Sequence, residues 1–261
     1  MIEVNNLCKD FPLNKKQQDE TGVKQKHLRV LDHIGFECRP GRIFSLLGPN
    51  GAGKTTTLRI IATILKASAG QVKVCGIDLN DNPLAARGKM GFLTGTTGLY
   101  ERLTPNEILG YFGKLQGMER QQVNESKSRL FDLLDMHSFA NKRIGKLSTG
   151  MKQKVSICRT MIHDPEVVVF DEPTTGLDVI TARNIINLIR DCKEQNKTVI
   201  FSSHIMSEVD LLCDDLAIIH QGKILFNDTM ENFRGQMQTP NLTEEFIQIV
   251  QKATLHNQTK Q

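Results

Sequence analysis

"GPNGAGKT", residues 48–55, matches the pattern Gly-x4-Gly-Lys-Thr. Glycines at this spacing let consecutive backbone N–H groups turn inward around an anion. The apolar residues 43–47 just before the loop predict a buried strand, and residues 54–65 after it predict a helix. The positive N-terminal end of that helix would face the same anion. A strand, a glycine-rich loop and a helix in this order predict a phosphate-binding loop in an α/β fold.

The side chains of the loop indicate a nucleoside triphosphate rather than a simple phosphate. A lysine at position 54 is expected to reach the β- and γ-phosphates, and the hydroxyl of Thr55 is expected to ligate Mg²⁺. The residues that we expect to bind the nucleotide here are Gly48, Pro49, Asn50, Gly51, Ala52, Gly53, Lys54, Thr55 and Thr56.

Two further strand ends carry candidate catalytic groups. The apolar run 167–170 ends in Asp171 and Glu172. Asp171 is expected to hold Mg²⁺, and Glu172 to polarise an attacking water; alone, such a pair could equally be two solvated acids. His204 follows the apolar run 198–202 and could contact the γ-phosphate, although a histidine at a strand end is often structural.

Composition narrows the class of protein. A chain of 261 residues with 39% apolar and 24% charged residues predicts a globular protein of one or two domains. The net charge of +4 and the absence of Trp argue against a nucleic-acid surface. Six scattered cysteines without a Cys-x-x-Cys pair indicate neither a zinc site nor a disulfide framework. The apolar runs are too short to span a bilayer, so a membrane role needs another chain's helices.

The order of predicted elements divides the chain. Strands alternate with helices before residue 100 and after residue 160, which predicts a mainly parallel sheet. Thr104-Pro105-Asn106-Glu107 is a capping box with proline at the first helical position, and a helical segment of about 100–160 follows. We expect a nucleotide-binding domain over 1–235 and a C-terminal helical tail over 236–261. Strands are predicted near 2–12, 30–47, 71–75, 167–170, 198–202 and 216–220, and helices near 122–136, 181–195 and 243–252.

Two stretches are more specific than the phosphate loop. "LSTGMKQKV" (147–155) and "VVVFDEPTTGLD" (167–178) resemble the signature and nucleotide-binding motifs of the ATP-binding cassette (ABC) family. Together with "GLYERLT" (98–104), they resemble most the ATPase subunits of bacterial ABC-2 type exporters, particularly the sodium-extruding NatAB type. The resemblance implies the P-loop NTPase fold of ABC ATPases, with a mainly parallel core sheet, a small antiparallel β part and an inserted helical subdomain.

The resemblance also implies a partner and a ligand set. In this family two cassettes pair head to tail, and the signature turn of one closes over ATP held by the other. Ser148 would then supply a hydroxyl and Gly150 a backbone N–H to the partner's γ-phosphate, while Asp178 would lie at the same interface. Phe11 fits the aromatic position that stacks on adenine, although an aromatic beside a strand is usually core. ATP and Mg²⁺ are the implied ligands.

The same family docks on membranes through other subunits. The resemblance implies an ATP-hydrolysing subunit at the cytoplasmic face of the cell membrane, bound to an ABC-2 type permease and driving export. Sodium ions, drugs and lipid-linked molecules all fit as cargo. A soluble ABC ATPase acting on ribosomes or DNA is the alternative, but such proteins usually carry two cassettes or a long coiled coil, and this chain has one phosphate loop and no sustained heptads.

The chain departs from the family pattern at two positions. Gly95 stands where the family commonly has a glutamine that contacts Mg²⁺ and senses the permease; a hydroxyl of Thr94, Thr96 or Thr97 could substitute. Thr149 replaces the first glycine of the signature. The permease contact is expected over residues 97–112, where Leu99 and Tyr100 either form part of a groove for a permease helix or cap the core of the helical segment.

Overall fold

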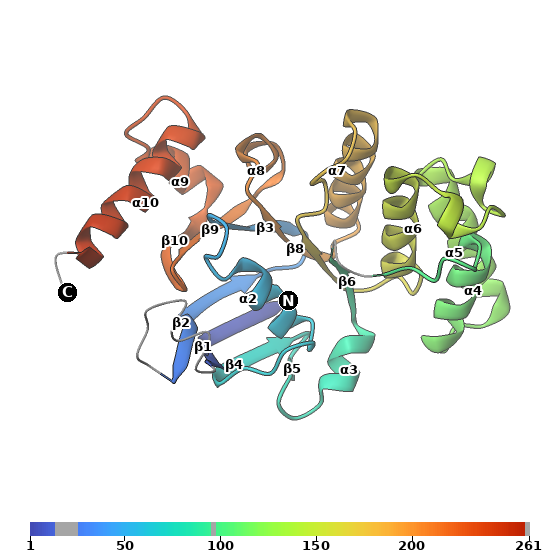
Figure 1. The fold of residues 1–261 in the computed structure, drawn as a ribbon, viewed down its shortest axis with the longest axis horizontal. Helices are drawn as coiled ribbons and strands as arrows, with labels where there is room; N and C mark the ends of the chain where they lie inside the picture. The colour runs from blue at the N-terminus through green and yellow to red at the C-terminus, as the bar shows by residue number, and fades with distance from the viewer. Residues whose placement is uncertain (14–25, 95–97, 259–261) are drawn as a thin grey trace.

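The computed structural model describes residues 1–13, 26–94 and 98–258. Figure 1 shows two sheets side by side, with helices around them. The strands are β1 (Ile2–Pro12), β2 (His27–Cys38), β3 (Arg42–Leu47), β4 (Ala69–Val74), β5 (Ile77–Asp78), β6 (Met90–Thr94), β7 (Val167–Asp171), β8 (Thr198–Ser203), β9 (Asp215–His220) and β10 (Lys223–Thr229). The helices are α2 (Lys54–Ile61), α3 (Pro83–Gly88), α4 (Pro105–Leu115), α5 (Arg120–Leu133), α6 (Thr149–Met161), α7 (Val179–Glu194), α8 (Met206–Leu212), α9 (Met230–Gln236) and α10 (Leu242–Gln258), with short 3-10 turns η1 (His137–Phe139) and η2 (Ile144–Lys146).

The larger sheet has the strand order β10-β9-β3-β8-β7-β6. All its neighbouring strands are parallel except β10, which pairs with β9 antiparallel. Strands β3, β7 and β8 are buried over nearly their whole length, as expected for parallel strands covered on both faces. Because parallel strands share one carboxyl edge, residues after β3, β7 and β8 meet at the same end of the sheet.

The smaller sheet, β2-β1-β4-β5, is antiparallel throughout. Helix α2 lies between the two sheets, where Leu58 and Ile61 are fully buried (Figure 1). They pack with apolar side chains of both sheets in one core cluster, such as Leu31 of β2 and Phe44 of β3. This packing holds the N-terminus of α2 over the end of β3. The predicted fold, a mainly parallel core sheet with a small antiparallel part, is confirmed.

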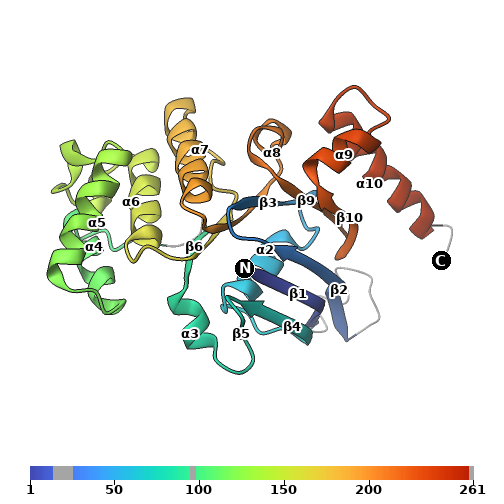
Figure 2. The same cartoon turned by 180° about the vertical axis from the view of Figure 1, so that it is seen from behind.

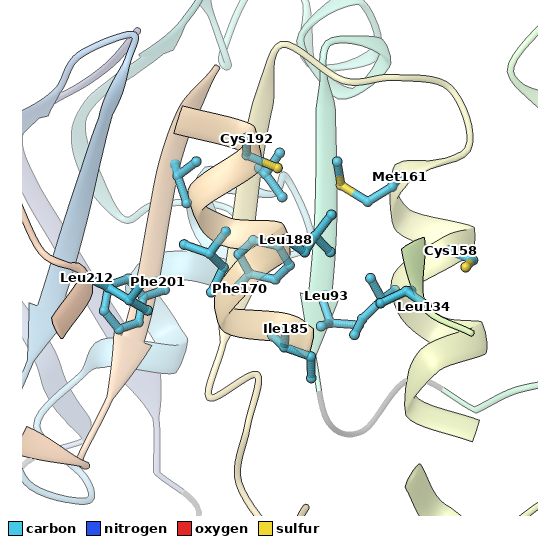
Figure 3. Close-up of a cluster of buried hydrophobic side chains, with 14 of the residues drawn as sticks. Leu93, Leu134, Cys158, Met161, Phe170, Ile185, Leu188, Cys192, Phe201 and Leu212 are labelled. Carbon is cyan, nitrogen blue, oxygen red and sulfur yellow. The ribbon is translucent and has the colours of Figure 1, made fainter. Parts of the chain in front are cut away.

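A second core covers the other face of the larger sheet and continues into the helical segment. Figure 3 shows Ile185 and Leu188 of α7 in one cluster with Phe170 of β7 and Met161 of α6. Helix α4 begins at the predicted capping box: the Thr104 hydroxyl accepts a hydrogen bond from the Glu107 N–H at 3.2 Å. The helical segment is therefore not separately folded, because its apolar face is buried against the α/β core.

The C-terminal helix α10 is longer than the predicted 243–252 and packs at the opposite end of the molecule from α4 and α5 (Figure 2). Leu242 at its start is buried in the same core as Phe233 of α9. The Glu245 carboxylate accepts hydrogen bonds from the N–H groups of residues 238 and 239 at 2.8 and 3.0 Å, which ties α10 to the chain before it. Among the described residues, no helix is both long and apolar enough to cross a membrane.

Candidate functional site

The predicted phosphate-binding loop connects the buried strand β3 to helix α2. Gly53, directly before α2, has a φ of 111°, which favours glycine. A Cβ atom there would lie 2.6 Å from a side-chain carbon of Leu31, and one on Gly48 would lie 2.3 Å from the Ile219 carbonyl oxygen. Both positions therefore exclude a side chain. The first turn of α2 has no acidic residue and no side-chain cap, so its N–H groups remain available to an anion.

Lys54 is a buried cation at the start of α2, with only 5% of its surface exposed. Its ammonium group donates hydrogen bonds to the carbonyl oxygens of Gly48 and Pro49 at 2.7 and 3.1 Å. Burial lowers the pKa of Lys54, while the carboxylates of Glu172 and Asp171 act in the opposite direction. The loop thus holds the positively charged Lys54 ammonium next to the expected position of the phosphates.

Asp171 ends strand β7 and is buried. Its Oδ1 accepts hydrogen bonds from the hydroxyls of Thr55 at 3.1 Å and Ser202 at 2.8 Å. A carboxylate and a hydroxyl are the hard oxygen ligands that Mg²⁺ prefers, usually together with substrate phosphates and water. The pair predicted as metal ligands is therefore brought together, and its donor set fits magnesium.

Glu172 lies at the sharp turn after β7, with a φ of 50° that is uncommon outside glycine. Its N–H is held by β8, because it points to the hydroxyl of Ser202 at 3.1 Å and to the Ser202 carbonyl oxygen at 3.2 Å. Its Oε1 lies 3.2 Å from Nδ1 of His204 and 3.9 Å from the ammonium of Lys54. The strained turn aims the carboxylate across the end of the sheet toward the phosphate loop.

A cavity of about 300 Å³ opens at this edge. It is lined by residues 50–56 of the phosphate loop, by Glu172 and by Val30 of β2. Gly48 and Pro49 of the loop do not line the cavity, but their carbonyl oxygens accept hydrogen bonds from the Lys54 ammonium. Phe11 is not among the lining residues: it lies on β1 opposite Leu28, with its ring 4.9 Å from the ammonium of Lys9. Its adenine-stacking role stays a prediction.

The predicted signature turn lies at the start of α6. The Ser148 hydroxyl caps this helix by accepting a hydrogen bond from the Met151 N–H at 3.3 Å. Asp178 caps α7 in the same way, and the N–H and hydroxyl of Thr181 hold the pKa of its carboxyl below the ordinary value. A Cβ atom on Gly150 would lie 3.4 Å from the Asp178 carboxylate, so the two helix starts are neighbours. Ser148 is exposed and does not line the cavity.

The structure describes only some of the residues at which the chain departs from the family pattern. Gly95, Thr96 and Thr97 lie outside the described residues. Thr94 ends β6 directly beside Asp171, its Cα partner on β7. Thr149 is the first residue of α6, a position that accommodates a side chain without strain.

Comparison with known proteins decides the family. A family model described as "ABC transporter" matches residues 31–175, which hold the phosphate loop, the signature turn and both carboxylates. The chain belongs to this family. It is 40% identical over 228 residues to the ABC transporter ATP-binding protein NatA of Bacillus subtilis, covering 86% of this chain and 92% of NatA.

Solved structures agree with that assignment. The ATP-binding subunit of an ABC transporter matches with a TM-score of 0.83 at 25% identity, covering 95% of this chain and 99% of that one. A dimeric ATP-binding cassette in a post-hydrolysis state with ADP and Pi matches with a TM-score of 0.76 at 23% identity, covering 88% and 99%. The ABC ATPase described here thus shares their fold, and it binds and hydrolyses ATP as a member of the family.

Several residues that shape the site of this ABC ATPase carry no sequence signal of their own. Val30 lines the cavity only because β2 crosses beside the phosphate loop. Ser202 touches Asp171 and Glu172, although in the Ser-Ser-His stretch only the histidine was predicted to act. Glu208 contacts the loops beside Glu172 and His204 from α8, a helix that the sequence pattern did not predict. These contacts depend on which strands are neighbours in the sheet.

Proposed function

We propose that this ABC ATPase powers export through a separate membrane permease, and that two cassettes close over ATP during each cycle. The single observation that carries the proposal is the division of the site. Lys54 and Glu172 line one cavity, and Asp171 and His204 lie beside them through their contacts with Thr55 and Glu172. The exposed Ser148 and the half-buried Gly150, at the start of α6, do not line it. A signature turn without its own nucleotide is explained if it serves the nucleotide of a second cassette.

In the proposed reaction, the chain's own side chains orient and deprotonate the attacking water. The Glu172 carboxylate takes the proton, and the neighbouring His204 imidazole holds the water and the γ-phosphate in line. Lys54 exchanges its hydrogen bonds to the loop carbonyls for bonds to phosphate oxygens. Magnesium, held by Thr55 and Asp171, would supply positive charge to the phosphate oxygens.

The partner cassette is proposed to complete this site with the helix N-terminus of α6. The first turn of α6 contains no acidic residue, so its N–H groups and dipole favour an approaching phosphate. Asp178 at the start of α7 stands beside Gly150 and would meet the partner in the same closure. ATP therefore joins the two cassettes, and hydrolysis releases them. A homodimer is the simplest assembly that meets this requirement.

The permease is proposed to dock on an aromatic ledge of the helical segment, which we define as Tyr100, Tyr111 and Phe112. The Tyr100 and Tyr111 ring centroids are 6.4 Å apart, and those of Tyr111 and Phe112 are 5.4 Å apart. Tyr100 and Tyr111 are 57% and 47% exposed. Leu99 and Phe112 are partly buried against the core, so Tyr100 and Tyr111 provide most of the exposed aromatic surface of the ledge. Aromatic side chains that remain partly exposed, one before α4 and two on it, suit a helix from an ABC-2 type permease.

Sodium ions are the proposed cargo, since the chain's motifs resemble the sodium-extruding NatAB type and its identity with NatA is 40%. This assembly would place the ATPase at the cytoplasmic face of the membrane. The test uses the full chain purified with its native permease and reconstituted in vesicles with outward-facing ATPase. We expect ATP-driven uptake of radioactive sodium, absent in vesicles with Glu172→Gln. Full ATP turnover without any uptake of sodium would refute sodium as cargo. Failure to recover any permease with the tagged chain would refute the transport role.

A further inference from the structure

Two loops at the end of the larger sheet carry the side chains proposed to act on the attacking water. Glu172 follows β7 and His204 follows β8, and their carboxylate and imidazole approach to 3.2 Å. Glu172 has left-handed backbone dihedrals, and the His204 side chain is 43% exposed. Because Glu172 lies in a strained turn and the His204 ring is partly exposed, other residues must hold this pair in its geometry.

A single carboxylate on α8 bridges these loops. Oε1 of Glu208 accepts a hydrogen bond from the Thr174 hydroxyl at 2.5 Å, and Oε2 accepts one from the Ser203 hydroxyl at 3.0 Å. Thr174 is two residues after Glu172, and Ser203 directly precedes His204. Both hydroxyl residues are buried, at 6% and 2% exposure. Glu208 is thus bonded to both loops at once, one oxygen for each.

The bond to Ser203 also orders the backbone beyond His204. The Ile205 N–H donates a hydrogen bond to the Ser203 hydroxyl at 3.0 Å. The Ser203 hydroxyl thus accepts from Ile205 and donates its own hydrogen to the carboxylate of Glu208, which can only accept. Residues 203–205 are therefore held on both sides of His204. Loss of the carboxylate would leave two buried hydroxyls without this acceptor and free the loops to move independently.

We propose that Glu208 is a positioning residue for ATP hydrolysis, which sets the distance between Glu172 and His204 without touching the nucleotide. The inference rests on the proposed roles of those two residues. Glu208 is not among the residues that line the nucleotide cavity. Its removal should therefore lower the rate of the chemical step and leave ATP binding intact, because the phosphate loop does not depend on it.

Kinetics of the full-length chain with Mg-ATP test the proposal. Glu208→Ala is expected to lower kcat on the order of 10- to 100-fold, the range for small misplacements of catalytic groups, with the Kd and KM for ATP within about twofold of the parent. Glu208→Gln should lie between the two, because its amide still accepts from one hydroxyl and donates to the other. Asp210→Ala is the matched control: Asp210 is a carboxylate on the same helix that instead contacts Arg234 at 2.7 Å, so parent kinetics are expected.

A double-mutant cycle separates positioning from a general structural effect. If Glu208 acts through His204, then Glu208→Ala in a His204→Ala background lowers kcat little further, whereas independent effects multiply. Multiplying effects, or a raised KM with unchanged kcat, would overturn the proposal. Should Glu208→Ala fail to fold, Thr174→Val and Ser203→Ala each remove one of the two bonds and are expected to lower kcat separately; parent kcat in both would also overturn it.

The same assay distinguishes this inference from the function on which it rests. Glu172→Gln is measured alongside the other variants. If Glu172→Gln loses turnover while Glu208→Ala keeps it, the positioning role of Glu208 is wrong and the proposed base stands. If Glu172→Gln turns over ATP at the parent rate, the proposed base itself is wrong, and with it the inference about Glu208.

Discussion

The phosphate loop and the signature turn have the same local design but opposite surroundings. Each places small residues before the N-terminus of a helix, α2 or α6, that has no acidic residue in its first turn. At the phosphate loop, Lys54 is buried and the carboxylates of Asp171 and Glu172 lie within reach of the loop's side chains. At the signature turn, Ser148 is exposed and its hydroxyl accepts only a weak helix-capping bond at 3.3 Å among the contacts described for it.

The difference shows that similar anion-binding turns become different sites through their neighbours. Strands β7 and β8 deliver acids and a histidine to the phosphate loop, because their carboxyl ends share an edge with β3. Helix α6 instead leaves its N-terminus beside that of α7, with Asp178 and Thr181 next to Gly150. The first site has its catalytic side chains within one chain, whereas the second, as proposed, is completed by a partner cassette. Four experiments test these assignments.

The largest effect is expected when the base is removed from the complete site. Glu172→Gln keeps the shape of the side chain but cannot accept the proton, so we expect kcat to fall by about 10²–10⁴-fold. ATP affinity should stay near the parent value, because Lys54 and the loop glycines are unchanged. Steady-state ATPase assays and equilibrium ATP binding measure both quantities. Glu194→Gln, at an exposed acid near the end of α7, is the control and should behave as the parent.

The second-largest effect is expected on the dimer that forms through the signature turn at Ser148. Glu172→Gln protein with Mg-ATP should form a dimer, and adding Ser148→Arg should weaken it by about 2 kcal/mol or more, roughly 30-fold in the dissociation constant, because a bulky side chain enters the closing turn. Light scattering over a range of concentrations gives this constant. Ser128→Arg, at an exposed serine on α5, is the matched control. A Ser148→Arg protein that dimerises like the parent would contradict the partner role of the turn.

A comparable loss is expected at the aromatic ledge, but only toward the permease. Tyr100→Ala removes a side chain that is 57% exposed, so the free energy of unfolding should change by less than about 1 kcal/mol. Recovery of permease with the tagged chain should fall, since aromatic anchors often contribute about 2 kcal/mol. Leu84→Ala, at an exposed leucine on α3, serves as control. A large drop in melting temperature would instead assign Tyr100 to the core of the helical segment.

The smallest effect separates the two uses of Ser148. Ser148→Ala removes the cap of α6 and should destabilise the monomer by about 1 kcal/mol, a shift of roughly 2–4 °C in melting temperature. Ser148→Asp retains a capping oxygen and should restore the stability of the monomer. Its negative charge would repel the γ-phosphate bound to a partner cassette, so we expect Ser148→Asp not to form the ATP-dependent dimer. Thermal unfolding without nucleotide, followed by light scattering with Mg-ATP, compares the three proteins. Equal stability of all three would mean that the hydroxyl does not cap the helix.

Much of the architecture follows from local pattern. The predicted strand 43–47 corresponds to β3, a continuous buried apolar run, and the predicted helix 181–195 corresponds to α7, which buries one face at helical spacing. Prediction was weaker for short elements. Helices α3, α8 and α9, each of six or seven residues, were not predicted, and α2 ends at Ile61 rather than near residue 65. Short helices gain most of their stability from tertiary packing, which leaves little signal in a single sequence.

The amino-acid sequence alone predicted the chemistry that is contiguous in the chain: a phosphate loop at residues 48–55, acids at the end of one strand and a histidine at the end of another. It did so because backbone geometry within a few residues sets those motifs. Folding in three dimensions was needed to bring Ser202 to both Asp171 and Glu172, to place Val30 at the cavity and to let Glu208 join two loops. Those contacts join residues 20 or more positions apart, or lie on a helix without its own signal. They arise from the order in which β7, β8 and β3 pair in the larger sheet and from the position of β2 in the smaller one.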